Sequence, residues 1–241
     1  MKSLFYLTLF VLLIAPLAHA DFKPTLFDQF FKAVGGRSNL ENLKTIERAG
    51  DIEFPDHGQA SPKGKGNYRT ELIYPDKVRV HIDVGSYIYD ELRNENIYLS
   101  FQKGGFKEVT DPSQKKQLDE TSLKANRELL YWVAEHTEIE NAKESPNWAK
   151  QSACVTGKKS EKSEFVCFDK KTHLLSAVGS PDEYRVYQEW KATDGIKFPM
   201  HLIHYKKAVI SYEIKLSSLS VNKLIAAQNF EKPEEKSSTT K

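Results

Sequence analysis

The most constraining feature of this sequence is a two-residue alternation of apolar and polar side chains that recurs along most of the chain. It is clearest in Val78–Val84, where valine and isoleucine alternate with Arg79, His81 and Asp83. Such alternation predicts a half-buried antiparallel strand, because successive side chains of a strand point to opposite faces of the sheet. A fold dominated by antiparallel β-structure follows.

Similar segments, separated by turns such as Asp194-Gly195, recur to the end of the chain. They predict further strands at residues 45–54, 67–74, 86–92, 96–102, 106–110, 152–157, 164–168, 173–178, 184–191, 197–205, 208–217 and 219–222. A sheet with this many strands tends to curl, and one of its faces must be covered by other elements. The sequence therefore predicts one long, curved antiparallel sheet.

Three segments have helical character instead. Residues 24–34 place apolar side chains at helical spacing and end at Gly35-Gly36. Ser38 is expected to cap a short second helix at 39–44. Residues 118–144 contain no Gly or Pro and show no alternation, and they predict one helix of about twenty residues. This mid-chain helix is the expected cover for the inner face of the sheet.

The N-terminus has the pattern of a secretory signal peptide. A positive start is followed by an apolar run from Leu4 to Ala18 and by the small-residue cleavage pattern Ala18-His19-Ala20. The run is short for a membrane span, although an uncleaved anchor is the alternative. We expect residues 1–20 to be removed, residues 21–230 to form one domain, and the polar residues 231–241 to be disordered.

The two cysteines also bear on location. The first cysteine is Cys154, so no cysteine near the cleavage site could carry a lipid anchor. The sequence therefore predicts a periplasmic protein, with secretion as the second choice. In an exported protein, Cys154 and Cys167 are expected to form a disulfide across a hairpin. The alternative is a redox pair, but such pairs usually have only two residues between the cysteines.

Composition and motifs exclude several function classes. The chain has 35 Lys and Arg against 33 Asp and Glu, a net charge of +2, which does not favour nucleic-acid binding. No nucleotide-binding, metalloprotease or nucleophile-elbow motif is present. His201 and His204 fall on opposite faces of a strand, and His136 with Glu140 is more typical of a solvated helix face. We predict no enzyme activity, metal or cofactor.

Several segments in a fixed order resemble the outer-membrane lipoprotein-sorting (LolA/LolB-like) superfamily. The shared segments are Ala33-Val34-Gly35-Gly36 followed by Leu40, Leu43–Ile46 and Gly50; Tyr74–Arg79; Val166–Leu175; Asp194–Pro199; Val221-Asn222; and Phe230–Pro233. Each motif is weak alone, but their joint order spans most of the chain after residue 20. The chain departs from the membrane-anchored receptors of this superfamily because it lacks their N-terminal cysteine.

This resemblance implies a mainly β fold with helices: an unclosed antiparallel half-barrel covered by a helical lid over an apolar cavity. It also implies that the cavity holds lipid or lipoprotein acyl chains. Candidate lipid-binding residues on the inner face of the sheet are Val80, Ile82, Ile97, Leu99, Ile210, Tyr212 and Ile214. Candidates on the lid are Leu129, Leu130, Trp132 and Val133. The alternative is that all of these residues are ordinary core.

The sequence thus favours a carrier or binding protein for lipid or lipoprotein acyl chains. Its further partners would include a membrane-bound donor or acceptor protein. Two alternatives from other classes remain open at this stage: a secreted hydrolase whose site the sequence does not reveal, and an interaction module on a β-scaffold without a cavity.

Overall fold

The computed structural model describes residues 25–56, 63–85, 87–102, 105–124, 127–142 and 149–232. The predicted signal peptide, and all but two residues of the predicted tail, lie outside these ranges. Within them, none of the helices combines the length and hydrophobicity needed to cross a membrane.

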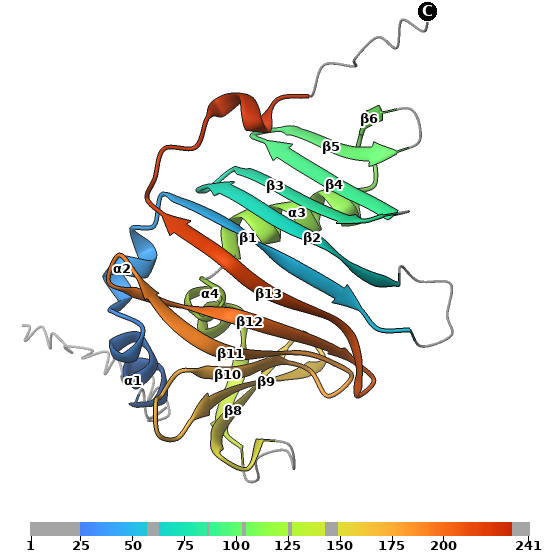
Figure 1. Ribbon diagram of the computed structural model, residues 1–241. Coiled ribbons are helices and arrows are strands. Elements are labelled where there is room, and N and C mark those ends of the chain that lie inside the picture. Colours follow the sequence, from blue (N-terminus) through green and yellow to red (C-terminus); the bar gives the residue numbers. More distant parts are fainter. Residues whose placement is uncertain are drawn as a thin grey trace, which may run out of the picture.

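Thirteen strands form one sheet (Figure 1). The single antiparallel sheet was predicted, but residues 219–221 continue the strand expected at 208–217 and do not form a separate one. The strands are β1 (Thr45–Phe54), β2 (Gly64–Ile73), β3 (Lys77–Val84), β4 (Tyr87–Asn94), β5 (Ile97–Gln102), β6 (Gly105–Glu108), β7 (Thr137–Asn141), β8 (Ser152–Lys159), β9 (Lys162–Asp169), β10 (Leu175–Gly179), β11 (Glu183–Thr193), β12 (Ile196–Lys206) and β13 (Val209–Val221). Their order across the sheet is β6-β5-β4-β3-β2-β1-β13-β12-β11-β10-β9-β8-β7. The sheet is not closed.

The path of the chain explains where the helices lie. The first and last strands, β1 and β13, pair with each other in the middle of the sheet. Strands β6 and β7 are consecutive in sequence but form the two opposite edges. The segment between them must therefore cross the full width of the sheet, and it carries the helices α3 and α4, which lie together behind the strands in Figure 1. The unclosed half-barrel with a helical lid is confirmed.

The mid-chain region differs from the single helix predicted at 118–144. It forms α3 (Pro112–Lys124), α4 (Glu128–Glu135) and then β7. Helix α3 begins earlier than predicted because the Asp111 carboxylate accepts the Ser113 backbone N–H at 2.7 Å. Residues 137–141 are a strand because they pair with β8 at the edge of the sheet, and this long-range pairing overrides the local helical tendency.

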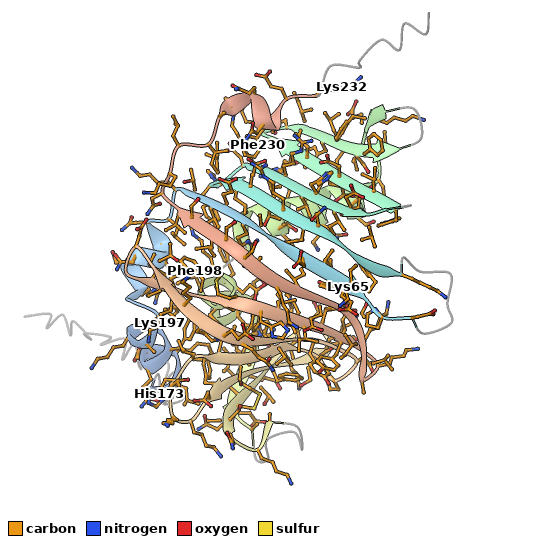
Figure 2. All side chains as sticks on the ribbon, viewed as in Figure 1. Lys65, His173, Lys197, Phe198, Phe230 and Lys232 are labelled. Carbon is orange, nitrogen blue, oxygen red and sulfur yellow. A yellow bond between two sulfur atoms is a disulfide. The ribbon has the colours of Figure 1, made fainter. Side chains whose placement is uncertain are left out.

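The N-terminal helices pack against one end of the sheet. They are α1 (Thr25–Ala33) and α2 (Arg37–Glu41), and a 3-10 helix, η2 (Ala227–Phe230), follows β13. Lys197 and Phe198 lie beside these N-terminal helices (Figure 2), and the Lys197 backbone N–H donates to the Val34 carbonyl at 2.8 Å. The predicted Ser38 cap is wrong: Gly36 occupies the N-cap of α2, and no side chain caps that helix.

The main core lies between α1, α4 and the sheet. Phe27 of α1 stacks on Trp132 of α4 at 5.9 Å between ring centroids and meets the Phe168 ring edge-on at 5.4 Å. All three side chains are buried. The N-terminal helix therefore packs simultaneously on the lid and on β9.

The predicted disulfide is present. Cys154 on β8 and Cys167 on β9 lie directly opposite each other in the antiparallel ladder, and their sulfurs are bonded. The disulfide joins the two strands of a hairpin near the edge of the sheet. This position is typical of a structural disulfide.

Candidate functional site

A cavity of about 920 Å³ lies between the sheet and the helices. Its walls come from α1, α3 and α4 on one side and from strands in both halves of the sheet on the other, including β1–β4 and β9–β13. The volume is at the upper end of the range typical of small-molecule sites. The cavity exists because the lid segment spans the curved sheet without filling the space beneath it.

Seven of the eleven predicted lipid-binding residues line this cavity. From the sheet and the lid these are Val80, Ile82, Leu129, Leu130, Trp132, Tyr212 and Ile214. They come from β3, β13 and α4, which are far apart in the sequence. The structure therefore brings most of the predicted residues to the wall of one cavity.

The other four predicted residues lie elsewhere. Ile97 is 56% exposed and Val133 is 39% exposed. Leu99 is buried in a separate cluster with Phe230, away from the cavity. Ile210 is not part of the cavity wall: it pairs with Tyr205 of β12, whereas Tyr212 pairs with His204, which lines the cavity.

The position of Ile210 has a structural cause. The register between β12 and β13 shifts between His204 and Tyr205, where β13 carries one extra residue. A bulge of this kind breaks the two-residue alternation that would otherwise place Ile210 and Tyr212 on the same face. Sequence alternation alone does not reveal the bulge.

A group of polar side chains connects the lid to the sheet inside the cavity. The Glu128 carboxylate of α4 accepts hydrogen bonds from Arg185 Nη1 and from the Tyr187 hydroxyl of β11, both at 2.6 Å. The charge of Glu128 raises the pKa of Arg185, and burial raises the pKa of the Tyr187 phenol well above its usual range. At neutral pH the arginine is charged and the tyrosine is a neutral donor.

His136 forms a second link between lid and sheet. It lies just after α4 and is buried, whereas the sequence predicted a solvated side chain. Its ring stacks on the Trp132 ring with 4.0 Å between the centroids. Its Nε2 is 3.0 Å from a carboxylate oxygen of Glu164 on β9. Glu140, the predicted neighbour of His136 on a helix face, is instead part of β7.

A third polar feature lies on the wall formed by β1 and β2. Arg48 lines the cavity, and its Nε donates to the Thr70 hydroxyl at 3.0 Å. The prediction of an apolar lining missed this arginine, although its place in the two-residue alternation of β1 could have indicated that it faces inward. Arg48 falls in phase with Ile46 and Ile52, the buried residues of β1.

The histidine pair on β12 is divided between two faces, as the sequence predicted. His201 Nε2 is 2.6 Å from Glu213, whereas His204 lines the cavity and contacts Glu183 at 3.1 Å. Among the residues that the structure describes, no group of three or more side chains is arranged to hold a metal ion.

Sequence comparisons identify no relative of this chain. It matches no protein-family model, and no curated protein matches it. The fold, in contrast, has clear counterparts among solved structures. An outer membrane lipoprotein-sorting protein domain from Vibrio parahaemolyticus aligns with a TM-score of 0.55 at 11% identity, covering 86% of this chain and 94% of that chain.

Two further structures have the same architecture. A DUF1329 family protein from Desulfovibrio piger aligns with a TM-score of 0.57 at 10% identity. A LolA superfamily protein from Nitrosomonas europaea aligns with a TM-score of 0.53 at 10% identity. Each alignment covers 86% of this chain and 96% of the other. The resemblance inferred from the sequence is thus confirmed at the level of the fold: this chain has the fold of the LolA superfamily.

Proposed function

We propose that this protein is a periplasmic carrier that binds acyl chains of a lipid or lipoprotein in the cavity beneath α3 and α4. The observation that carries this proposal is the cavity itself, a space of about 920 Å³ whose walls include aliphatic and aromatic side chains of both sheet and lid. Each methylene group that leaves water for such a surface gains about 0.8 kcal/mol. A long acyl chain therefore has ample driving force to enter.

Two further observations support a carrier. A domain with this fold, from Vibrio parahaemolyticus, is described as lipoprotein-sorting. The alternative of an interaction module without a cavity requires a filled interior, and the space under the lid does not match that requirement. Export by a cleaved signal peptide and transfer from or to a membrane-bound partner are parts of the proposal that rest on the sequence.

The direct test is to express the full chain with its leader, isolate it from the periplasm, and examine it by native mass spectrometry and by lipid extraction. We expect bound species with the masses of acyl lipids. We also expect the delipidated protein to take up a fluorescent fatty-acyl probe. A protein that emerges empty and takes up no probe would exclude the carrier function.

A matched pair of variants on β3 and β4 localises the binding. Ile82 lines the cavity, whereas Ile88 is 44% exposed on the neighbouring strand. A glutamate at position 82 would place a charge against the acyl chain, at a high desolvation cost. We expect Ile82→Glu to lower probe affinity at least tenfold and Ile88→Glu to leave it unchanged, with circular dichroism confirming that both variants fold.

A further inference from the structure

Most titratable groups that line the cavity already contact a partner, either as an ion pair or as a histidine–carboxylate hydrogen bond. The described pairs are Arg185 with Glu128, His136 with Glu164, Lys159 with Glu135, and His204 with Glu183. Glu91, on the same wall as Arg48, accepts a hydrogen bond from Gln114 of α3. These groups leave little unsatisfied charge in the less exposed part of the lining; Lys162 and Lys197 also line the cavity, but both are exposed to solvent.

Arg48 is different. Its only side-chain hydrogen bond within the described part of the chain joins Nε to the Thr70 hydroxyl at 3.0 Å, and no described carboxylate lies within 4.0 Å of its guanidinium. The side chain is half-buried, and it lines the cavity. The terminal nitrogens of a guanidinium carry donors in a fork that fits the two oxygens of a carboxylate or phosphate.

Arg127, another arginine of the cavity wall, differs from Arg48 in its hydrogen-bond partners. Arg127 also lacks a carboxylate partner among the described residues, but it donates to the backbone carbonyls of Leu40, Glu41 and Leu43. Its guanidinium also lies over the Tyr74 ring at 3.8 Å. Arg127 therefore has a structural role in joining α2 to the lid, whereas Arg48 retains unused donors.

A second donor on the cavity wall is also unsatisfied. The indole Nε1 of Trp132 is buried and has no hydrogen-bond acceptor among the described residues. An indole N–H can only donate, and a partly buried cation without a counter-ion is unfavourable. The indole nitrogen has almost no exposed surface, so the donors that a ligand in the cavity can reach are those of Arg48, which are complementary to a group that only accepts.

We propose that Arg48 recognises the anionic head of an amphiphile whose acyl chain occupies the cavity. The head is a carboxylate or a phosphate, held by the terminal nitrogens of Arg48 beside Thr70. The chain lies along Val80 and Ile82 of β3, which is separated from Arg48 on β1 by Thr70 and Tyr68 of β2. This inference rests on the proposed carrier function and specifies the class of lipid.

The test compares ligands that differ only in their head. Oleate, oleoyl lysophosphatidate and oleyl alcohol share one chain, and their affinities for the delipidated protein are measured by displacement of a fluorescent acyl probe. We expect both anionic ligands, or the one whose head fits, to bind at least tenfold more tightly than the alcohol, because a hydrogen-bonded ion pair forms only with an anion. A preference for oleate identifies a carboxylate, and a preference for lysophosphatidate identifies a phosphate.

Variants then assign that preference to one residue. Arg48→Gln should bind oleyl alcohol as the parent protein does and lose the preference for the anion. Arg48→Lys should keep part of it, which also guards against misfolding of the glutamine variant. The matched control is Arg69→Gln: Arg69 is on β2, directly opposite Ala49, and its guanidinium pairs with Glu47 and Glu71 rather than lining the cavity.

The outcomes separate this inference from the function on which it rests. If the alcohol binds and neither anion binds more tightly, the headgroup role of Arg48 is wrong while the carrier function stands. The same conclusion follows if Arg48→Gln keeps the full preference. If none of the three ligands binds, both proposals fail.

Discussion

Glu128 shows how single residues hold the lid on the sheet. It lies in the first turn of α4, where a negative charge also interacts favourably with the helix dipole. Its carboxylate accepts from Arg185 and Tyr187, which lie two residues apart on β11. The three side chains form a clamp, and the clamp is partly solvated because the Arg185 side chain is 42% exposed.

Removing the charge of Glu128 should therefore loosen the lid. We expect Glu128→Gln to lower the free energy of unfolding by about 1.5–3 kcal/mol, the usual value for hydrogen bonds to charged groups. Urea denaturation measures this change. The control is Glu161→Gln in the exposed turn between β8 and β9, which should have no effect. Equal stability of the two variants would show that the clamp contributes nothing.

His204 makes stability depend on pH. Burial lowers the pKa of its imidazole, and this effect outweighs the neighbouring Glu183 carboxylate, which raises it. The unfolded chain therefore binds a proton more readily than the folded protein. The resulting stability is present above the unfolded pKa of about 6.5 and is lost as the pH falls towards the lower folded pKa.

The expected result is a lower urea midpoint at about pH 5.5 than at about pH 7.5, with a smaller difference in His204→Gln. The glutamine variant removes the titrating group and keeps a polar side chain of similar length. If both proteins lose the same stability over this interval, another group is responsible for the pH dependence.

At the scale of elements, strands that follow a pattern within one segment were predicted correctly. The positions where one element ends and another begins were not. The alternation at 45–54 coincides with β1, and the cysteine spacing gave the hairpin of β8 and β9. The region 118–144 was mispredicted because Thr137–Asn141 pairs with β8, a contact that no local pattern encodes. The Asp111 cap was likewise missed, since the expected helix began after it.

Helix α4 packs closely on β8, and Gly157 permits this contact. A Cβ atom at position 157 would lie 2.9 Å from the Trp132 ring and 3.0 Å from Cβ of His136. We expect Gly157→Ala to destabilise the protein by about 1–3 kcal/mol through overpacking. Thermal denaturation measures the change.

A double-mutant cycle separates this contact from other effects of the alanine. In a Trp132→Leu background the ring is absent, so Gly157→Ala should cost less than in the parent protein. Strictly additive costs would place the clash elsewhere, for instance in the backbone of β8.

For the whole molecule, the decisive feature is that β6 and β7 are consecutive in sequence yet occupy opposite edges of the sheet. This topology carries the lid across the sheet (Figure 1). A cavity lies beneath the lid. Because the cavity exists only in the folded protein, a bound acyl chain should stabilise the entire fold.

Ligand binding should therefore raise the melting temperature. At a free concentration of about 100 times its Kd, a ligand specific for the folded state stabilises it by about 2.7 kcal/mol. For a chain of this size we expect a shift of about 5–10 °C, measured by differential scanning calorimetry with oleyl alcohol. Butanol at equal concentration is the control and should produce no shift. An unchanged melting temperature at saturating long-chain ligand would contradict binding in the cavity.

The sequence by itself determined most of the strands and the disulfide partners, because alternation and cysteine placement are properties of local sequence. The half-barrel with a helical lid was implied by the resemblance of several ordered segments to a known superfamily. The sequence also identified seven of the residues that line the cavity. Only the tertiary structure decided that Ile210 and Leu99 lie away from the cavity, and that Arg48, Glu128 and Arg185 line it. The physical reason is that a bulge, a strand pairing or a charge pair depends on residues distant in sequence, whose positions are fixed only when the whole sheet has formed.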